Sequence, residues 1–167
     1  MCIRDRASIG LIDGDHSQGA LPTYTAMDYA IEMAKKTGIA AVGVTNSSHF
    51  GPAGAYTLYA AKKNMIALAF CNSDSFVRLY DGAERFHGTN PISMAVPTGG
   101  SNPWLFDMAT SSVPFNRVEL YRSLNQKLPS DVASDVSGNS TEDPHIAEML
   151  DPLGAKFGFK GAGLGAV

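Results

Sequence analysis

The order of apolar runs and helix-like segments in the first 63 residues most constrains the fold. Residues 7–11 and 39–45 are apolar runs of strand length, and residues 22–38 between them carry apolar side chains at helical spacing. A second helix is expected over residues 53–63. Strands that alternate with helices are typical of α/β folds, because parallel neighbours need a crossover between them. We therefore predict a mixed, largely parallel sheet with flanking helices.

Three further apolar runs, over residues 65–70, 92–96 and 104–108, extend the predicted sheet. The run at 92–96 alternates larger and smaller side chains, which is typical of a strand with one buried face. We expect the larger side chains at its even-numbered positions to face the core, and Ser93 and Ala95 to face outward. A chain of 167 residues has an ordinary length for one domain.

The second half of the chain is less regular. A helix is expected after residues 110–112, whose hydroxyl groups could cap it. Residues 128–143 are polar and rich in turn formers, so we expect a surface excursion with a reverse turn at 135–139. Residues 152–165 combine many glycines with two lysines, which could hold a phosphate. The glycines could equally serve only to let a helix pack tightly.

Charge and composition exclude several classes of function. The formal net charge is −3, so the chain lacks the basic excess that nucleic-acid binding requires. No stretch approaches the roughly 20 apolar residues of a membrane helix, and the start has no secretory signal, so we expect a cytoplasmic protein without a membrane partner. Its two cysteines, Cys2 and Cys71, and its four histidines lack metal-binding spacing, so no metal site is predicted.

Polar loops that follow two predicted strands are candidate functional sites. His49 lies between the run at 39–45 and the next helix, and Ser73 and Asp74 follow the run at 65–70. Ligands of open α/β sheets bind beyond the carboxyl ends of strands, so His49 is either a site residue or a structural loop histidine. Asp107 is the one charge in an apolar run and must therefore be a structural acceptor or a ligand contact.

Several ordered motifs resemble the malate/L-lactate dehydrogenase family, which is distinct from the Rossmann-type enzymes and includes ureidoglycolate dehydrogenase. The stretches that carry the resemblance are 11–15 (LIDGD), 46–54 (NSSHFGPAG), 88–92 (GTNPI), 107–110 (DMAT), 152–154 (PLG) and 160–164 (KGAGL). The resemblance implies the family's own α/β fold and a dimer or higher homo-oligomer. It also implies an NAD- or NADP-dependent oxidoreductase that interconverts a small 2-hydroxy acid and its 2-oxo acid.

The resemblance also implies roles for single residues. His49 would take the hydroxyl proton as hydride leaves the carbon, and an imidazole can exchange protons in both directions near neutral pH. Ser73 and Asp74 match positions that contact the substrate. The expected cofactor contacts are Phe106, Asp107, Met108, Lys160 and Gly161.

The same resemblance indicates a fold truncated at both ends. Residues 7–167 would form the central cofactor-binding part of a subunit, with residues 1–6 outside the fold, and such a fragment could be inactive alone. A second hypothesis is a nicotinamide-binding module without catalysis, because the family's N-terminal substrate-binding motif has no match before Ala7. A third is a serine hydrolase that uses Ser47 or Ser73 with His49 and Asp74, although no GxSxG motif supports it.

Overall fold

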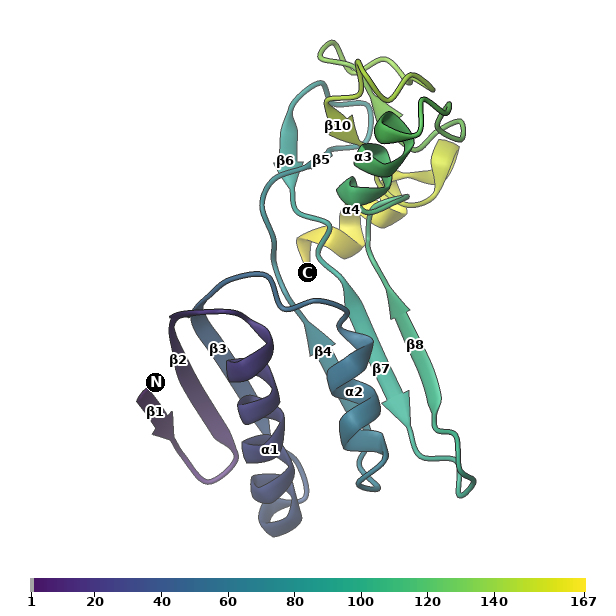
Figure 1. Ribbon diagram of the computed structural model, residues 1–167. Helices are drawn as coiled ribbons and strands as arrows, with labels where there is room; N and C mark the ends of the chain where they lie inside the picture. Colours follow the sequence, from purple (N-terminus) through teal and green to yellow (C-terminus); the bar gives the residue numbers. More distant parts are fainter. Residues whose placement is uncertain (1) are drawn as a thin grey trace. The chain divides into compact units, whose positions relative to one another are not determined.

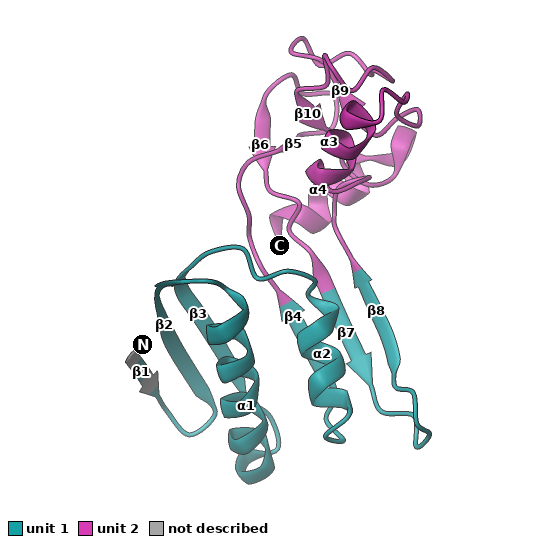
Figure 2. Ribbon diagram, in the orientation of Figure 1, with its two compact units in different colours: residues 1–69, 93–107 teal, residues 70–92, 108–167 magenta. Residues whose placement is uncertain are grey.

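The computed structural model describes residues 2–167 and divides into two compact units, where the length alone predicts one domain. Unit 1 comprises the chain up to Ala69 together with Ser93–Asp107, and unit 2 comprises Phe70–Ile92 and Met108–Val167 (Figure 2). The chain therefore passes from one unit to the other three times. Each unit has its own secondary structure and its own core.

The first part of unit 1 is a helix packed on a three-stranded sheet (Figure 1). The strands are β1 (Cys2–Asp5), β2 (Ile9–Ser17) and β3 (Ala41–Ser47), in that order across the sheet. Helix α1 (Ala20–Thr37) connects β2 to β3, which pair in parallel as the alternation predicts. It buries Ala26, Ile31 and Met33, and it ends at Gly38, whose φ of 86° suits a residue without a side chain.

The start of the chain differs from the prediction. The sequence places residues 1–6 outside the fold, but β1 pairs antiparallel with β2, with Cys2 opposite Asp13. Strand β2 also extends beyond the apolar run at 7–11, because it continues to Ser17. The β2–β3 register shifts between Asp13 and Ser17, and both Asp15 and His16 have a φ of 55°. The polar residues 13–17 thus form an irregular strand end.

The second part of unit 1 consists of helix α2 (Gly54–Ala61) and a sheet of β4 (Ala67–Phe70), β7 (Ile92–Val96) and β8 (Trp104–Met108). The predicted orientation of β7 is wrong: Ser93 and Ala95 are the fully buried residues. Ser93 Oγ lies 2.7 Å from Thr57 Oγ1 of α2, so the small side chains face the helix. Side-chain size does not identify the buried face of this strand, because both faces of this sheet carry apolar side chains.

That opposite face keeps large side chains in contact with solvent. Leu68 is 53% exposed and Trp104 is 51% exposed, and the Trp104 and Phe106 rings stack with centroids 6.3 Å apart. The prediction of a mixed α/β fold is confirmed, but the strands within residues 2–167 form three small sheets instead of one. Short connections such as residues 6–8 join antiparallel neighbours, which gives these sheets both pairing directions.

Unit 2 contains short strands, short helices and long loops. Its sheet has the order β6 (Arg85–His87), β5 (Val77–Arg78), β10 (Met149–Leu150) and β9 (Ala133–Ser134), in which only β5 and β10 pair in parallel. The helical elements are α3 (Phe115–Ser123), the 3₁₀ turn η1 (Ala155–Phe157) and α4 (Phe159–Ala166).

The core of unit 2 corrects the prediction for residues 128–143. Instead of a surface excursion, this segment contributes Leu128, Val132 and Ala133 to a cluster with Val118 and Leu150. The reverse turn at 135–139 is present, because Gly138 N–H donates to the Asp135 carbonyl at 3.0 Å. The polar segment therefore surrounds a short buried strand, which is too short to show a periodic pattern.

The predicted hydroxyl cap of α3 is wrong. Pro114 occupies the cap position, and no side chain caps the helix there. Ser111 Oγ donates instead to the Val113 carbonyl at 2.8 Å, and Ser112 Oγ donates to the Pro152 carbonyl at 3.2 Å. These hydroxyl groups stabilise the loop before α3 and do not cap the N-terminus of the helix.

Candidate active site

His49 lies in the loop between β3 and α2, where the sequence predicts it, and its side chain is exposed. The residue before it is fixed to the end of β2, because Ser48 N–H donates to the Ser17 carbonyl at 3.1 Å. Gly51 follows with a φ of 78°, which turns the chain toward α2. An exposed imidazole on an anchored backbone has the access and the fixed position that proton transfer requires.

Asp107 is a structural acceptor, one of the two alternatives that the sequence leaves open. Its Oδ2 accepts a hydrogen bond from Gly54 N–H at the start of α2, at 2.7 Å. A side chain at Gly54 would not fit, since its Cβ would lie 2.6 Å from that oxygen. A carboxylate at the N-terminus of a helix is also favoured by the helix dipole. Asp107 therefore joins β8 to the segment that carries His49.

Ser73 belongs to a hydrogen-bonded loop cluster within unit 2. Its Oγ accepts a hydrogen bond from Thr89 N–H at 2.9 Å, and its N–H donates to Asn90 Oδ1 at 3.1 Å. Asn90 Nδ2 donates in turn to the Gly165 carbonyl at 2.7 Å. Gly88 has no room for a side chain, because its Cβ would lie 2.3 Å from Ser73 Oγ. The motif at 88–90 thus ties the loop after β4 to helix α4.

This cluster gives no support to the hydrolase hypothesis, because the Ser73 hydroxyl bonds to Thr89 within a structural network. Asp74, the neighbouring substrate-binding candidate, has an exposed side chain. Cys71 precedes them in the same loop, and its burial raises the pKa of its thiol to about 11. A thiol with so high a pKa is a poor nucleophile near neutral pH.

The glycine-rich end of the chain favours packing as the role of Gly161. A Cβ at this position would lie 2.3 Å from the Leu153 carbonyl oxygen, so the helix and the preceding loop are in direct backbone contact. Lys160 is exposed, with its ammonium 5.7 Å from the centroid of the Phe157 ring. The lysine is thus available to an anion, whereas the space beside Gly161 is already filled.

The remaining cofactor candidates lie along β8. Phe106 is 37% exposed and belongs to the apolar face that it shares with Trp104, and Met108 is partly buried. Unit 1 contains His49, Phe106 and Asp107, and unit 2 contains Ser73, Asp74, Met108, Lys160 and Gly161.

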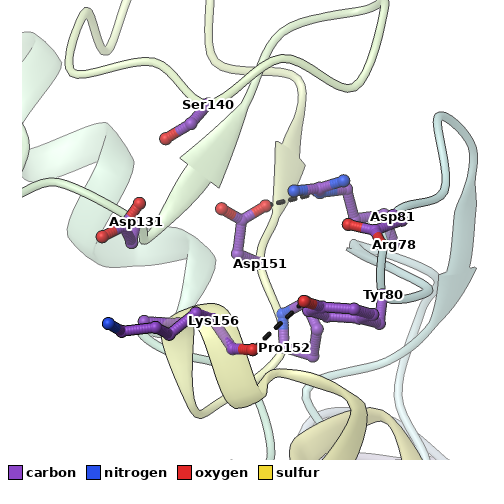
Figure 3. A pocket seen from close by; sticks show the side chains of 9 residues that line it. Arg78, Tyr80, Asp81, Asp131, Ser140, Asp151, Pro152 and Lys156 are labelled. Atoms are coloured by element: carbon purple, nitrogen blue, oxygen red, sulfur yellow. Dashed lines mark hydrogen bonds and ion pairs between the residues drawn. The ribbon is translucent and has the colours of Figure 1, made fainter.

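A cavity of about 320 Å³ in unit 2 is lined by charged residues (Figure 3). Arg78 Nε donates to Asp151 Oδ1 at 2.6 Å, and the two side chains are only 14% and 9% exposed. Ser134 Oγ donates to the same oxygen at 2.5 Å. None of the single residues to which the family resemblance gives a role lines this cavity, but Lys156 of the glycine-rich segment at 152–165 does. We interpret the pair as a structural link between β5 and the end of β10.

The described part of the chain has neither a candidate metal centre nor a candidate membrane helix. Over residues 2–167, no group of three or more His, Cys, Asp or Glu side chains could hold a metal ion. None of the helices in that range is long and apolar enough to cross a membrane.

Comparison with known proteins gives a consistent family match. The family model described as malate/L-lactate dehydrogenase matches residues 1–167. The malate dehydrogenase of Pyrococcus abyssi is 44% identical over 97% of this chain and 46% of its own length. The ureidoglycolate dehydrogenase (NAD(+)) of Escherichia coli O157:H7 is 34% identical over 89% of this chain and 43% of its own length.

A solved structure agrees with these relatives. The crystal structure of malate dehydrogenase from Entamoeba histolytica superposes with a TM-score of 0.92, at 34% identity, over 99% of this chain and 49% of that one. The chain therefore spans about half the length of the curated relatives it matches.

Proposed function

Because this chain belongs to the malate/L-lactate dehydrogenase family, we propose that it forms part of an NAD- or NADP-dependent dehydrogenase. The reaction would interconvert a small 2-hydroxy acid and its 2-oxo acid by hydride transfer. The single observation that carries the proposal is the family match over residues 1–167, which includes an exposed His49 on an anchored loop. A cytoplasmic location and a homodimer or higher homo-oligomer of the complete subunit belong to the same proposal.

Hydride transfer and proton transfer would be carried out by different groups. When bound, the nicotinamide would accept or return the hydride. His49 would take the hydroxyl proton in one direction and return it in the other, since its side chain is free to reach a substrate. Ser73 and Asp74 would contact the hydroxy acid. A dehydrogenase needs a defined geometry for this step, and the anchored loop of His49 is compatible with one.

The cofactor fits some of its proposed contacts better than others. Lys160 offers an exposed ammonium to a phosphate group, and Phe106 offers an exposed ring face. Gly161 would act by letting the backbone of α4 approach Leu153, which holds Lys160 in place. Asp107 would act through Gly54, whose N–H it accepts, and Met108 would continue the strand beside Phe106.

The first test is a fluorescence titration with NADH and NADPH, on this chain and on a version extended with the segments that its relatives possess. Turnover of malate, lactate and ureidoglycolate by the extended version identifies the acid. We expect His49→Ala to retain cofactor binding and to lose about 100- to 10,000-fold in kcat, the usual contribution of a general acid–base group. The matched control is His145→Ala, because His145 is also an exposed loop histidine.

Three outcomes would decide against parts of the proposal. Equal losses in the His49 and His145 variants would remove the acid–base role. A folded protein that binds neither nucleotide would remove the nicotinamide assignment. Binding without turnover, even in the extended version, would favour the non-catalytic module. The cofactor contact is tested separately by Lys160→Ala, with Lys127→Ala as an exposed control cation of the same unit.

A further inference from the structure

We propose that Tyr56 is the positioning residue for His49, an inference that rests on the proposed role of His49 in proton transfer. Tyr56 lies in α2 and is only 1% exposed. Its hydroxyl donates to the carbonyl of Phe50, the residue directly after His49. The Phe50 and Tyr56 rings also stack, with centroids 5.3 Å apart and planes inclined by 20°. One buried side chain therefore fixes both the backbone and the ring that follow His49.

A second contact to the His49 backbone is the close approach of the chain at Gly19. A Cβ at Gly19 would lie 2.2 Å from the Ser48 carbonyl oxygen and 2.9 Å from the His49 carbonyl carbon. Only a glycine lets the start of α1 come this close. Ser48 N–H is bonded to the Ser17 carbonyl on the same side. The backbone of residues 48–50 thus contacts both the start of α1 and Tyr56.

A third contact fixes the helix that carries Tyr56. Asp107 Oδ2 accepts the Gly54 N–H two residues before Tyr56, so the first turn of α2 is tied to β8. Tyr24 from α1 packs edge-on against the Tyr56 ring, with centroids 4.8 Å apart. Tyr56 therefore connects the His49 loop to α1, α2 and β8, which restrict the movement of that loop.

The choice of tyrosine at this position supports a positioning role. A phenylalanine would fill the same space without an oxygen, and burial of a hydroxyl is costly unless it is hydrogen-bonded. The hydroxyl adds a directed bond to the peptide beside His49, which packing alone does not provide. Proton transfer depends steeply on geometry, since a displacement of about 1 Å can cost about 100-fold in rate.

The test compares Tyr56→Phe with Tyr59→Phe. Tyr59 lies on the same helix, and its hydroxyl donates to Asp28 Oδ1 at 2.8 Å, so both variants lose one hydrogen-bonded phenol oxygen. The first readout is the NMR signal of the His49 imidazole in this chain, assigned by its disappearance in His49→Gln. We expect Tyr56→Phe to shift and broaden this signal and to leave His145 unchanged, whereas Tyr59→Phe should leave both unchanged.

The second readout is kinetic and uses the extended version described above. We expect Tyr56→Phe to lower kcat by about 10- to 100-fold, with a much smaller change in the KM of the hydroxy acid, because binding groups are untouched. Tyr59→Phe should change neither. A lower melting temperature with an unaltered His49 signal and unaltered kcat would show a purely structural role and overturn the inference.

The inference and the proposed function fail in different ways. If His49→Ala keeps full activity, the function of His49 is wrong, but the NMR comparison still measures whether Tyr56 orders its loop. If Tyr56→Phe does not fold, Gly19→Ala places a methyl group against the two peptide units that flank His49 and should perturb the His49 signal but not that of His145. An unperturbed His49 signal in a folded Gly19→Ala variant would count against an ordered loop and overturn the proposal.

Discussion

The two units differ in the interactions that stabilise each of them internally. Unit 1 packs helices on strands, with Ile31 of α1, Ala60 of α2 and Ala67 of β4 in one apolar cluster. Unit 2 has short strands of two or three residues, and its loops are joined by the buried Arg78–Asp151 pair and by the hydrogen bonds around Asn90. The stability of unit 1 therefore depends on periodic apolar packing. Unit 2 also has an apolar core around Val118 and Leu150, but it depends in addition on individual polar partners.

The largest expected effect that would test this contrast is the loss of Asp151. Asp151→Ala leaves the Arg78 guanidinium buried without its carboxylate, and removal of one partner from a buried pair costs about 3–5 kcal/mol. We expect hydrogen exchange, followed by mass spectrometry of peptides, to accelerate throughout unit 2 and much less in unit 1. The control is Glu148→Ala, which breaks the exposed pair with Arg85 and should cost less than about 1 kcal/mol.

A combined Arg78→Met and Asp151→Leu variant sharpens the same comparison. Replacement of both charges by apolar side chains avoids the unpaired guanidinium, so much of the lost stability should return. Equal losses for Asp151→Ala and Glu148→Ala would show that unit 2 does not depend on the buried pair. Equal acceleration of exchange in both units would show that they unfold as one.

The next largest effect concerns two glycines of α4. Gly161→Ala would place a methyl group against the Leu153 backbone, and such overpacking costs about 1–3 kcal/mol. A Cβ at Gly163 would meet only open space, with no neighbouring atom within 4 Å, so Gly163→Ala should stabilise the helix by about 0.5–1 kcal/mol. Chemical denaturation measures both changes. Similar effects from the two substitutions would contradict the packing role of Gly161.

The contrast between the units also explains what the sequence can predict. The helix at 22–38 and the run at 39–45 repeat their pattern over several turns or residues, and both appear in unit 1 close to their predicted bounds. In unit 2, β9 has two residues, so the core role of residues 128–143 leaves no periodic signal. The predicted orientation of β7 is wrong for another reason, since a sheet with two apolar faces does not mark its core side by hydrophobicity.

The candidate site shows the same limit. The loop position of His49 follows from its place between a strand and a helix, and the structure agrees. The partner of Asp107 lies 53 residues away in sequence, so only the need for some partner is predictable. The sequence predicts Tyr56 only as part of an apolar helix. A usable signal is nevertheless present, because a tyrosine in a buried helix stripe requires an acceptor for its hydroxyl.

The smallest expected effect compares one carboxylate in each unit. The pKa of Asp28 in unit 1 is lowered first by the Lys63 ammonium, which donates at 2.7 Å, and then by the Tyr59 hydroxyl. The pKa of Asp135 in unit 2 is lowered first by the backbone N–H of Asn139, with a further contribution from that of Ser137. A lowered folded-state pKa adds stability above the unfolded value, about 3.9, and this stability is lost as pH falls through the folded value.

High salt should reduce the stability contribution of Asp28 much more than that of Asp135. We expect Asp28→Asn and Asp135→Asn each to flatten the fall in unfolding free energy below about pH 4. At about 1 M salt the Debye length is about 3 Å, so the exposed Asp28–Lys63 pair should lose most of its contribution. Asp135 should keep its contribution, because its partners are backbone amides within one turn. Unfolding titrations at low and high salt measure both, and an equal response to salt would show that the two units do not differ in how they hold their acidic side chains.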